Sequence, residues 1–271
     1  MDPLARLTQA LEQTRGLVLV VTGAGVSLAS GIPTFRGKDP GAVWAKDVTE
    51  LGTVRYFRQD PAGSWQWYLG RFEKVLAAQP NAGHRALVEL ERWQLARGGK
   101  FLLVTQNIDP LHERAGSKEL VKVHGSAEKV RCSSQGCRLG APDGWIARAE
   151  VDLTAFLANP IDANVPRCPE CGALLRQHVL WFDEYYNGHN DYQWTRVLAA
   201  AASAELVIFA GTSLSVGVTQ LVHEAALERG VPAFSIDPAA QALPGVVAVP
   251  VAAEIALVEL GQRLGFPGSE K

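Results

Sequence analysis

The sequence has no marked excess of charge of either sign. Its 271 residues include 26 Lys and Arg and 28 Asp and Glu, which give a formal net charge of −2 at pH 7. Domains that bind nucleic acid or anionic membranes usually carry a strong basic excess. The balance therefore predicts that the chain binds neither partner. The remaining composition, with 47% hydrophobic and 20% charged residues, is typical of a soluble globular enzyme.

The chain also lacks an apolar run long enough to cross a membrane. Its first residues contain Asp2 and Glu12 and place Leu4, Leu7 and Leu11 at helical spacing. That pattern is typical of an amphipathic helix rather than of a signal or transit peptide. We therefore expect a cytoplasmic protein, which we also expect to be a monomer.

Cysteine is scarce, and the four cysteines fall into two close pairs. Cys132 and Cys137 are separated by four residues, and Cys168 and Cys171 by two. In a reducing compartment such pairs favour metal binding over disulfides. Four thiolates close a tetrahedral shell around zinc, so we predict one structural zinc. Four unrelated buried thiols, or a zinc ribbon that binds nucleic acid, are the alternatives; the pairing and the modest basic content of residues 126–181 disfavour them.

Most of the chain alternates between apolar runs and segments with helical spacing. This alternation predicts an α/β fold with a parallel, doubly wound sheet. Residues 37–61 look irregular and predict a long loop, while residues 126–181 break the alternation. The predicted strands are 17–21, 101–104, 120–123, 206–210, 233–237 and 246–251, and the predicted helices are 63–79, 82–97, 219–229 and 253–264.

The first predicted strand leads into a glycine turn, Gly23-Ala24-Gly25. Outward-pointing backbone N–H groups at such a turn, followed by a helix N-terminus, form a cradle for a dinucleotide pyrophosphate. The common dinucleotide fingerprint is incomplete, because Leu28 stands where a third small residue is expected. The string SGIPTFRG, residues 30–37, follows instead.

Other predicted strands also end in polar or glycine-rich turns, namely residues 106–109, residues 211–213 and Asp237. Ligands of open α/β sheets bind beyond the carboxyl ends of the strands. Asp237 could accept a hydrogen bond from a ribose, or it could simply form a turn. Asp109 could bind a ligand or cap the helix that Pro110 begins, and both can hold at once.

His124 ends a further predicted strand at this edge. A lone histidine is more often structural than catalytic. Its place in the same rim as the glycine turn, and its unperturbed pKa, favour proton transfer at neutral pH. His84 and His112 lie in predicted helices beside apolar residues, and we expect them to be structural.

Together these motifs resemble those of the sirtuins, the NAD-dependent protein deacylases. The resemblance covers nearly the whole chain: residues 23–37, the string TQNIDPLHERAG at 105–116, His124-Gly125, the four cysteines and residues 211–213. It implies a Rossmann-like domain of residues 1–37, 80–125 and 182–271, a cofactor loop and helical insertion of residues 38–79, and a zinc module of residues 126–181. It also implies that NAD contacts Gly23, Ala24, Gly25, Thr34, Phe35, Arg36, Gln106, Asn107, Ile108, Asp109, His124, Gly211, Thr212, Ser213, Asp237 and Ala253.

The resemblance further implies a reaction. Asn107 and Asp109 would grip the nicotinamide carboxamide while an acyl-lysine of a protein substrate attacks C1′ of the nicotinamide ribose. His124 would then activate a ribose hydroxyl as general base, giving free lysine, nicotinamide and O-acyl-ADP-ribose. Mono-ADP-ribosyl transfer to protein is the alternative reaction. A binding module without turnover is a second alternative, and the joint presence of Asn107, Asp109 and His124 argues against it.

Two positions depart from the sirtuin pattern. Sirtuins usually carry Asn where Asp237 stands, and Gly where Asp183 stands in Phe182-Asp183-Glu184, the strand that pairs with the substrate. Glycine lets two backbones approach closely. Asp183 therefore bears on peptide pairing, and Asp237 on the contact with the adenosine ribose.

The predicted helix 63–79 carries Tyr68 and Arg71 three residues apart and so on one face. A phenol and a guanidinium make a good clamp for a carboxylate. The pair is similar to that of the class III desuccinylase and demalonylase sirtuins, and Gly52 aligns with a small alanine of that class. We predict a preference for succinyl- or malonyl-lysine over acetyl-lysine, with Tyr68, Arg71, Gly52 and Phe182 binding substrate. The alternative is that Arg71 is an ordinary surface arginine.

Overall fold

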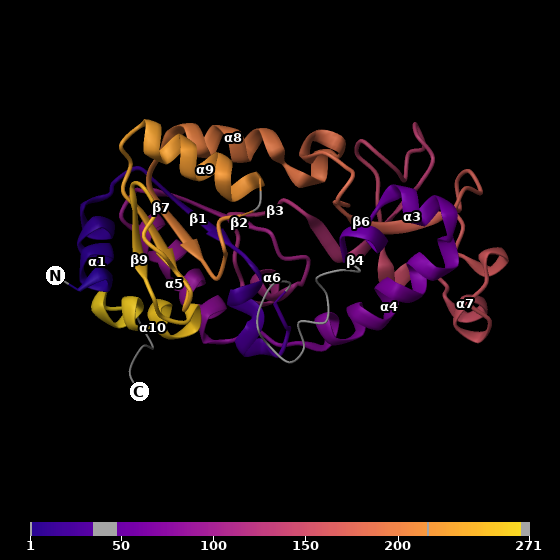
Figure 1. Cartoon of the computed structure of the whole chain (residues 1–271), viewed down its shortest axis with the longest axis horizontal. Helices are drawn as coiled ribbons and strands as arrows, with labels where there is room; N and C mark the ends of the chain where they lie inside the picture. The colour runs from indigo at the N-terminus through magenta and orange to yellow at the C-terminus, as the bar shows by residue number, and fades with distance from the viewer. Residues whose placement is uncertain (1, 35–47, 216, 267–271) are drawn as a thin grey trace.

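The computed structural model describes residues 2–34, 48–215 and 217–266. In Figure 1 the larger part of the molecule lies to the left and a smaller part to the right. None of the described helices is long and apolar enough to span a bilayer.

The larger part is built on a six-stranded sheet in the order β3-β2-β1-β7-β8-β9, with every neighbouring pair parallel. This is the order of a doubly wound dinucleotide-binding sheet, in which the chain reverses direction beside the first strand. The reversal falls between β1 and β7. The strands are β1 (Leu17–Thr22), β2 (Lys100–Thr105), β3 (Leu120–Lys122), β7 (Ala204–Ala210), β8 (Ala233–Ile236) and β9 (Val246–Val249).

Helices cover both faces of this sheet (Figure 1). On one face α1 (Pro3–Gln13), α5 (Ala82–Ala96) and α10 (Ala253–Arg263) bury leucines against β1 and β2. On the other face α8 (Trp194–Ser203) and α9 (Gly217–Glu228) pack through alanines and valines. The parallel, doubly wound fold predicted from the sequence is therefore confirmed.

The smaller part combines an antiparallel sheet with a helical segment. The sheet has the order β5 (Ile146–Ala147), β4 (Gly125–Cys132) and β6 (Leu175–Val179), and α7 (Thr154–Ala158) lies beside it. The helical segment comprises α2 (Val48–Leu51), α3 (Val54–Gln59) and α4 (Pro61–Ala77). Trp65 of α4 joins the two, because its indole N–H donates to the Leu175 carbonyl at 2.8 Å. One apolar cluster runs through both.

Short helices connect these elements: α6 (Leu111–Ala115) and the 3₁₀ helices η1 (Ala24–Ser30), η2 (Arg148–Glu150), η3 (Asp162–Asn164), η4 (Tyr186–Gly188) and η5 (Asn190–Tyr192). Pro110 precedes α6 as its cap position rather than starting it. The helix predicted at 63–79 begins earlier, at Pro61, because the Asp60 carboxylate accepts the Gly63 N–H at 2.7 Å and proline suits the first helical position.

The long loop predicted for residues 37–61 is wrong over its described part, which contains α2 and α3. Thr53 caps α3 by accepting the Tyr56 N–H at 3.0 Å. The Asp183 carboxylate accepts two more N–H groups of this turn, those of Val54 at 2.8 Å and Arg55 at 3.1 Å. Since Asp183 lies far along the chain, no local pattern could reveal this support.

Candidate functional site

The glycine turn lies where β1 and β7 meet. The Gly23 N–H donates to Ala210 O at 3.1 Å, and the Gly25 N–H donates to Gly211 O at 2.9 Å. A Cβ at Gly25 would lie 2.7 Å from the Gly211 Cα, so no side chain fits. These two N–H groups therefore point to the end of β7 and to Gly211, which corrects the expectation that the N–H groups of this turn point outward to a phosphate. Ala24 begins η1, a 3₁₀ helix.

Asn107 and Asp109 are buried beside this turn, only 5% and 4% exposed. The Asn107 amide donates to Gly23 O and to Ser27 Oγ, both at 3.0 Å. The Ser27 hydroxyl in turn donates to the Asp109 carboxylate at 2.8 Å. Ser27 thus joins the two predicted nicotinamide-binding residues, although it was absent from the predicted site.

Asp109 has a second role, since its other carboxylate oxygen accepts the Leu111 N–H at 3.0 Å. This is the helix-capping contact that the sequence left open beside ligand binding. Burial raises the pKa of the Asp109 carboxyl above its ordinary value. One oxygen of Asp109 is therefore committed to the backbone, and the other to Ser27.

Gln106 links three strand ends. Its amide donates to Thr22 O at 3.2 Å, at the end of β1, and to Thr212 Oγ1 at 3.1 Å, beyond β7. The next turn continues with Ser213, whose hydroxyl contacts Ser215 at 2.7 Å. Ile108 is half-buried, and its carbonyl accepts the Ala127 N–H at 2.9 Å. The structure thus brings Gln106 and Thr212 together at the carboxyl edge.

His124 lies against the same edge. Its Nδ1 is 2.9 Å from the Gln106 carbonyl, and its Nε2 is 3.3 Å from the Tyr186 hydroxyl. Because a carbonyl only accepts, Nδ1 carries the hydrogen and Nε2 holds the free lone pair. Burial lowers the pKa of His124 to about 4. This corrects the expectation of an ordinary pKa: His124 is a neutral base at pH 7.

His84 and His112 form a separate buried pair, with ring centroids 4.8 Å apart. His112 Nε2 contacts Thr22 Oγ1 at 3.1 Å, and His84 Nδ1 accepts the Asn81 N–H at 3.3 Å. Burial lowers the pKa of both. Each ring therefore braces an element end from within the core, in keeping with the structural role expected of them.

Some predicted cofactor contacts have other partners or lie elsewhere. The Asp237 carboxylate accepts the Ala239 N–H at 2.8 Å, so the turn left open by the sequence is present. Ala253 is buried at the start of α10. Thr34 is half-buried, while Phe35 and Arg36 lie outside the described residues.

The four predicted acyl-binding residues lie in two places, Tyr68 and Arg71 on α4, and Gly52 and Phe182 beside each other. Tyr68 is buried, with its ring 6.2 Å from and nearly parallel to that of Trp181. Arg71 lies with its guanidinium carbon 4.0 Å from the Trp67 ring centroid, and it donates to the Trp67 carbonyl at 3.1 Å. Burial raises the pKa of the Tyr68 phenol, which stays neutral.

Gly52 and Phe182 form the second contact. The Phe182 N–H donates to Gly52 O at 3.0 Å, and a Cβ at Gly52 would lie 2.8 Å from Val48 O and 3.2 Å from the Phe182 ring. Phe182 itself is 60% exposed. Since Trp181 touches Tyr68 and precedes Phe182, the two contacts adjoin along one segment.

The four cysteines come together at one point of the smaller part. Their sulfur atoms all lie within 4.8 Å of one another, with Cys132 3.5 Å from Cys171 and Cys137 3.7 Å from Cys168. Tetrahedral zinc with Zn–S bonds of about 2.3 Å separates its sulfur ligands by roughly 3.8 Å. No disulfide joins these cysteines. The donor set and its spacing fit one closed zinc site.

Comparisons with known proteins decide the family. The Sir2 family model matches residues 23–218. An NAD-dependent protein deacylase of Thermus thermophilus is 38% identical over 239 residues, covering 88% of this chain and 85% of that protein. The chain belongs to the Sir2 family.

Other relatives agree. The mitochondrial NAD-dependent protein deacylase sirtuin-5 of Canis lupus familiaris is 40% identical over 184 residues, which are 62% of this chain and 56% of that protein. A Sir2 homologue solved as its NAD complex matches with a TM-score of 0.78 at 34% identity, covering 96% of this chain and 93% of the other. A mutant Sir2 homologue in complex with ADP-ribose matches with a TM-score of 0.80 at 34% identity, covering 98% of this chain and 97% of the other.

This Sir2 chain carries two carboxylates after Phe182 whose partners lie far away in the sequence. Asp183, which replaces the usual glycine, binds the N-terminus of α3 as described above. Glu184 is the centre of a buried ion-pair network, because it accepts from Arg131 at 2.8 Å and from Arg176 at 2.7 Å. The segment Phe182-Asp183-Glu184, predicted as a strand, is a turn in the structure, so that prediction is wrong. Its two carboxylates anchor the turn to α3 on one side and to the zinc-module sheet on the other.

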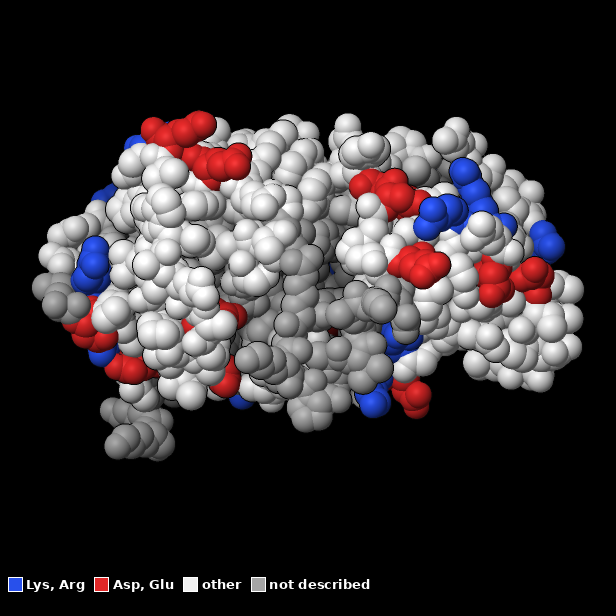
Figure 2. Space-filling model, in the orientation of Figure 1, with Lys and Arg blue, Asp and Glu red and all other residues white. Residues whose placement is uncertain are grey.

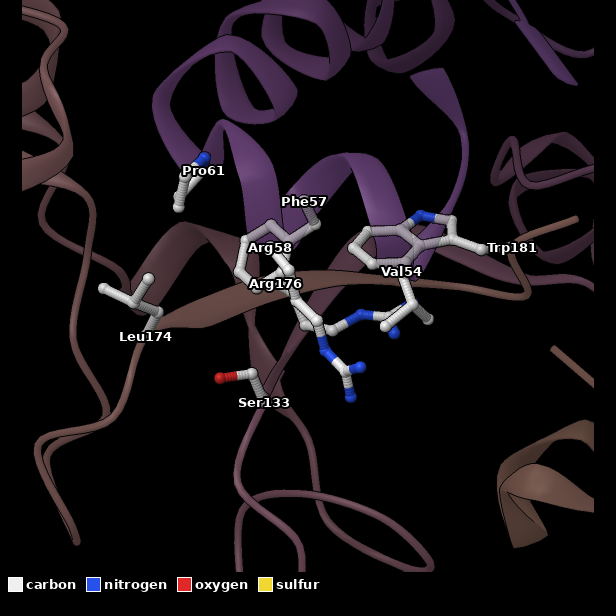
Figure 3. Close-up of a pocket in the computed structure, with 8 residues that line it drawn as sticks. All are labelled: Val54, Phe57, Arg58, Pro61, Ser133, Leu174, Arg176 and Trp181. Carbon is white, nitrogen blue, oxygen red and sulfur yellow. The ribbon is translucent and has the colours of Figure 1, made fainter. Parts of the chain in front are cut away.

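A pocket of about 280 Å³ lies between α3 and the zinc-module sheet of this Sir2 chain (Figure 3). Arg176 crosses it with its guanidinium carbon 3.3 Å from the Trp181 ring centroid. The residues that line the pocket are Val54, Phe57, Arg58, Pro61, Ser133, Leu174, Arg176 and Trp181. None of the predicted site residues is among them.

Figure 2 shows acidic and basic side chains interspersed over the smaller part on the face in view, with no continuous basic stripe among the described residues.

Proposed function

We propose that this chain is an NAD-dependent protein-lysine deacylase, and that it acts in the cytoplasm as a monomer. The observation that carries the activity is His124, a neutral histidine fixed through Nδ1 on the Gln106 carbonyl, beside the rim where Gln106, Asn107 and the glycine turn converge. The name of the Thermus relative supports the same activity.

Each residue of the site would have its own role in the reaction, according to its position. NAD would supply an electrophilic anomeric carbon and nicotinamide as its leaving group, and ADP-ribose would receive the acyl group. Asn107 and Asp109, held by Ser27, would hold the nicotinamide carboxamide in a site from which water is excluded. His124 would take the proton of a ribose hydroxyl at Nε2, with its Nδ1–H fixed on the Gln106 carbonyl.

The test is the release of nicotinamide from NAD by the purified zinc-loaded protein with an acyl-lysine peptide. Deacylation predicts that release requires the acyl group and that free lysine peptide and O-acyl-ADP-ribose form in equal amounts. The same peptide without its acyl group is the control. Nicotinamide release with ADP-ribose attached to protein would support ADP-ribosyl transfer instead, and no release would leave a binding module.

We further propose that succinyl- and malonyl-lysine are the preferred substrates. Tyr68, a neutral buried phenol, and Arg71 stand one turn apart on α4, and Tyr68 adjoins the Phe182 segment through Trp181. A guanidinium and a phenol match a carboxylate with N–H and O–H donors. Gly52 holds the Phe182 segment through its carbonyl, and the space on its Cβ side is filled by Val48 O and the Phe182 ring.

Arg71→Met should lower kcat/KM for a succinyl peptide by about 10- to 100-fold while sparing an acetyl peptide, because the acyl carboxylate loses a charged hydrogen-bond partner. Arg58→Met is the matched control, since Arg58 is exposed and lines the separate pocket of Figure 3. A wild-type enzyme that favours acetyl peptides, or equal losses on both peptides, would contradict the proposed preference.

A further inference from the structure

Tyr186 lies against the predicted general base and is not accounted for by the sequence motifs. It belongs to η4, which follows the Phe182 segment. Its ring is nearly parallel to that of His124, with centroids 5.8 Å apart and planes 19° apart. On its other side Trp194 stacks at 4.2 Å with planes 13° apart. Two aromatic layers, one from η4 and one from the start of α8, thus back the ring of His124.

The hydroxyl of Tyr186 lies between a backbone N–H and the imidazole of His124. The backbone N–H of Val218, near the start of α9, donates to the phenol oxygen. The phenol hydrogen can therefore point to His124 Nε2, 3.3 Å away. Because the Nδ1–H of His124 is already donated to Gln106 O, Nε2 is the acceptor. The donors then follow one another in one direction, from the Val218 N–H to the Tyr186 oxygen, from the Tyr186 O–H to His124 Nε2, and from His124 Nδ1–H to the Gln106 carbonyl.

We propose that Tyr186 is a positioning residue of the deacylation reaction, holding the His124 ring with an unprotonated Nε2 turned to the ribose. This inference rests on the proposed function of the site. Before ribose binds, the phenol occupies the Nε2 lone pair, so the base keeps one tautomer and one orientation. A ribose hydroxyl would then take the place of the Tyr186 hydroxyl at Nε2, and the His124 ring would not have to turn or change its tautomer.

The surroundings of His124 leave this role to Tyr186. Among the described residues, Gln106 at the end of β2 and Tyr186 in η4 are the hydrogen-bond partners of the ring, and of these only Tyr186 titrates. Burial raises the pKa of Tyr186, so the phenol is neutral throughout the working range. A neutral O–H donor stabilises neutral imidazole over imidazolium.

The test is the pH profile of kcat/KM for an acyl peptide with Tyr186→Phe, which keeps the stacked ring and removes only the hydroxyl. The acid limb should move to higher pH by about 0.3–1 unit, and the plateau should fall by about 2- to 10-fold, the worth of one neutral hydrogen bond. Tyr185→Phe is the matched control, because the neighbouring Tyr185 is 79% exposed. Its profile should equal that of the wild type.

A second measurement does not depend on turnover. Imidazole ¹⁵N chemical shifts of His124 should report a single Nδ1–H tautomer in the wild type and a mixed or mobile population in Tyr186→Phe. Profiles and shifts of Tyr186→Phe that match those of Tyr185→Phe would overturn the inference. If the wild type releases no nicotinamide with any acyl peptide, the proposed function fails, and the ¹⁵N shifts still decide whether Tyr186 sets the His124 tautomer.

Discussion

The carboxyl edge of the six-stranded sheet and the zinc-module sheet with its helical segment are built in different ways. At the edge, strand ends are held by neighbouring strands, and side chains such as Gln106 bond to backbone carbonyls and hydroxyls. In the smaller part, charged and metal-binding side chains from distant segments meet, as Glu184 meets Arg131 and Arg176. The first region draws its geometry from a sheet, and the second from side-chain chemistry.

The difference teaches which conditions each region resists. Neutral hydrogen bonds to a fixed backbone depend little on salt or metal. Thiolates and a buried Arg–Glu network depend on a bound cation and on the protonation of every partner. Changes to the metal, the base, the pH and the glycine turn each test this contrast, and the largest effect is expected for the metal.

Removal of zinc should unfold the smaller part and leave the six-stranded sheet folded. Structural zinc contributes on the order of 10 kcal/mol in isolated zinc-finger peptides, and the cysteines here adjoin the cluster of Trp65 and Trp181. Tryptophan fluorescence and amide exchange of Cys168→Ser should report this loss. Ser133→Ala, beside Cys132 and exposed, is the control. Unchanged exchange protection in β4 and β6 after zinc removal would show that the smaller part does not depend on the metal more than the six-stranded sheet does.

His124→Ala should do the opposite, removing activity without loosening either region. Loss of a general base typically costs roughly 10²–10⁴-fold in rate. NAD affinity, measured by calorimetry, should remain close to that of the wild type, since the glycine turn and Asn107 keep their contacts with each other. Near-normal turnover of an acyl peptide would remove His124 from the role of base.

Acidification should weaken both regions through their buried histidines, and His84 in α5 and His178 in β6 test one in each region. Burial lowers the pKa of each to about 4, below an ordinary 6.5, so the unfolded chain binds protons more readily. Stability present above pH 6.5 is therefore lost towards pH 4, on the order of 2–3 kcal/mol for each histidine. Asp191, 2.9 Å from His178, favours its charged form, and burial lowers the pKa of His178 despite this contact.

Urea unfolding between pH 7 and pH 4, with zinc kept bound, measures this loss. His84→Asn and His178→Asn each remove one titrating group and should flatten the fall of unfolding free energy with pH. A slope identical to that of the wild type in both variants would show that the fall has another origin.

The smallest effect expected is that of Gly25→Ala. The new Cβ would lie 2.7 Å from the Gly211 Cα, and neither backbone can give way without disturbing β1 or β7. We expect a loss of about 1–3 kcal/mol in unfolding free energy, together with weaker NAD binding. Gly70→Ala is the matched control, because open space surrounds Gly70 within helix α4. It should be neutral or slightly stabilising.

The parts of the fold that could be predicted from the sequence are those with local causes. Apolar runs marked the strands, and their ends marked the rim that holds Gln106, Asn107 and His124. Ser27 was missed because one hydroxyl in a short helix carries no periodic signal, although it lies within the glycine-turn string. Tyr186 was missed because an aromatic residue in a turn has no preferred partner until the chain has folded.

Nonlocal support explains the other differences. Helix α3 receives two of its N-terminal hydrogen bonds from Asp183, a residue that the sequence marked only as a departure from glycine. The raised pKa of Asp109 and the lowered pKa of His124 arise from burial, which follows from the whole fold rather than from neighbours in the chain.

The pairing of β1 with β7 has a consequence for synthesis. The Gly16 N–H donates to the Glu205 carboxylate, and the Gly25 N–H donates to Gly211 O, so the first strand waits for a segment made almost 190 residues later. In a nascent chain that has been synthesised only as far as β3, the glycine turn lacks β7 and Gly211, whose carbonyls accept its hydrogen bonds. Such late, long-range closure is slow and leaves β1 with an open edge on the ribosome. A dinucleotide bound at this turn, as we propose, would therefore favour the completed sheet and would stabilise the finished chain over every shorter one.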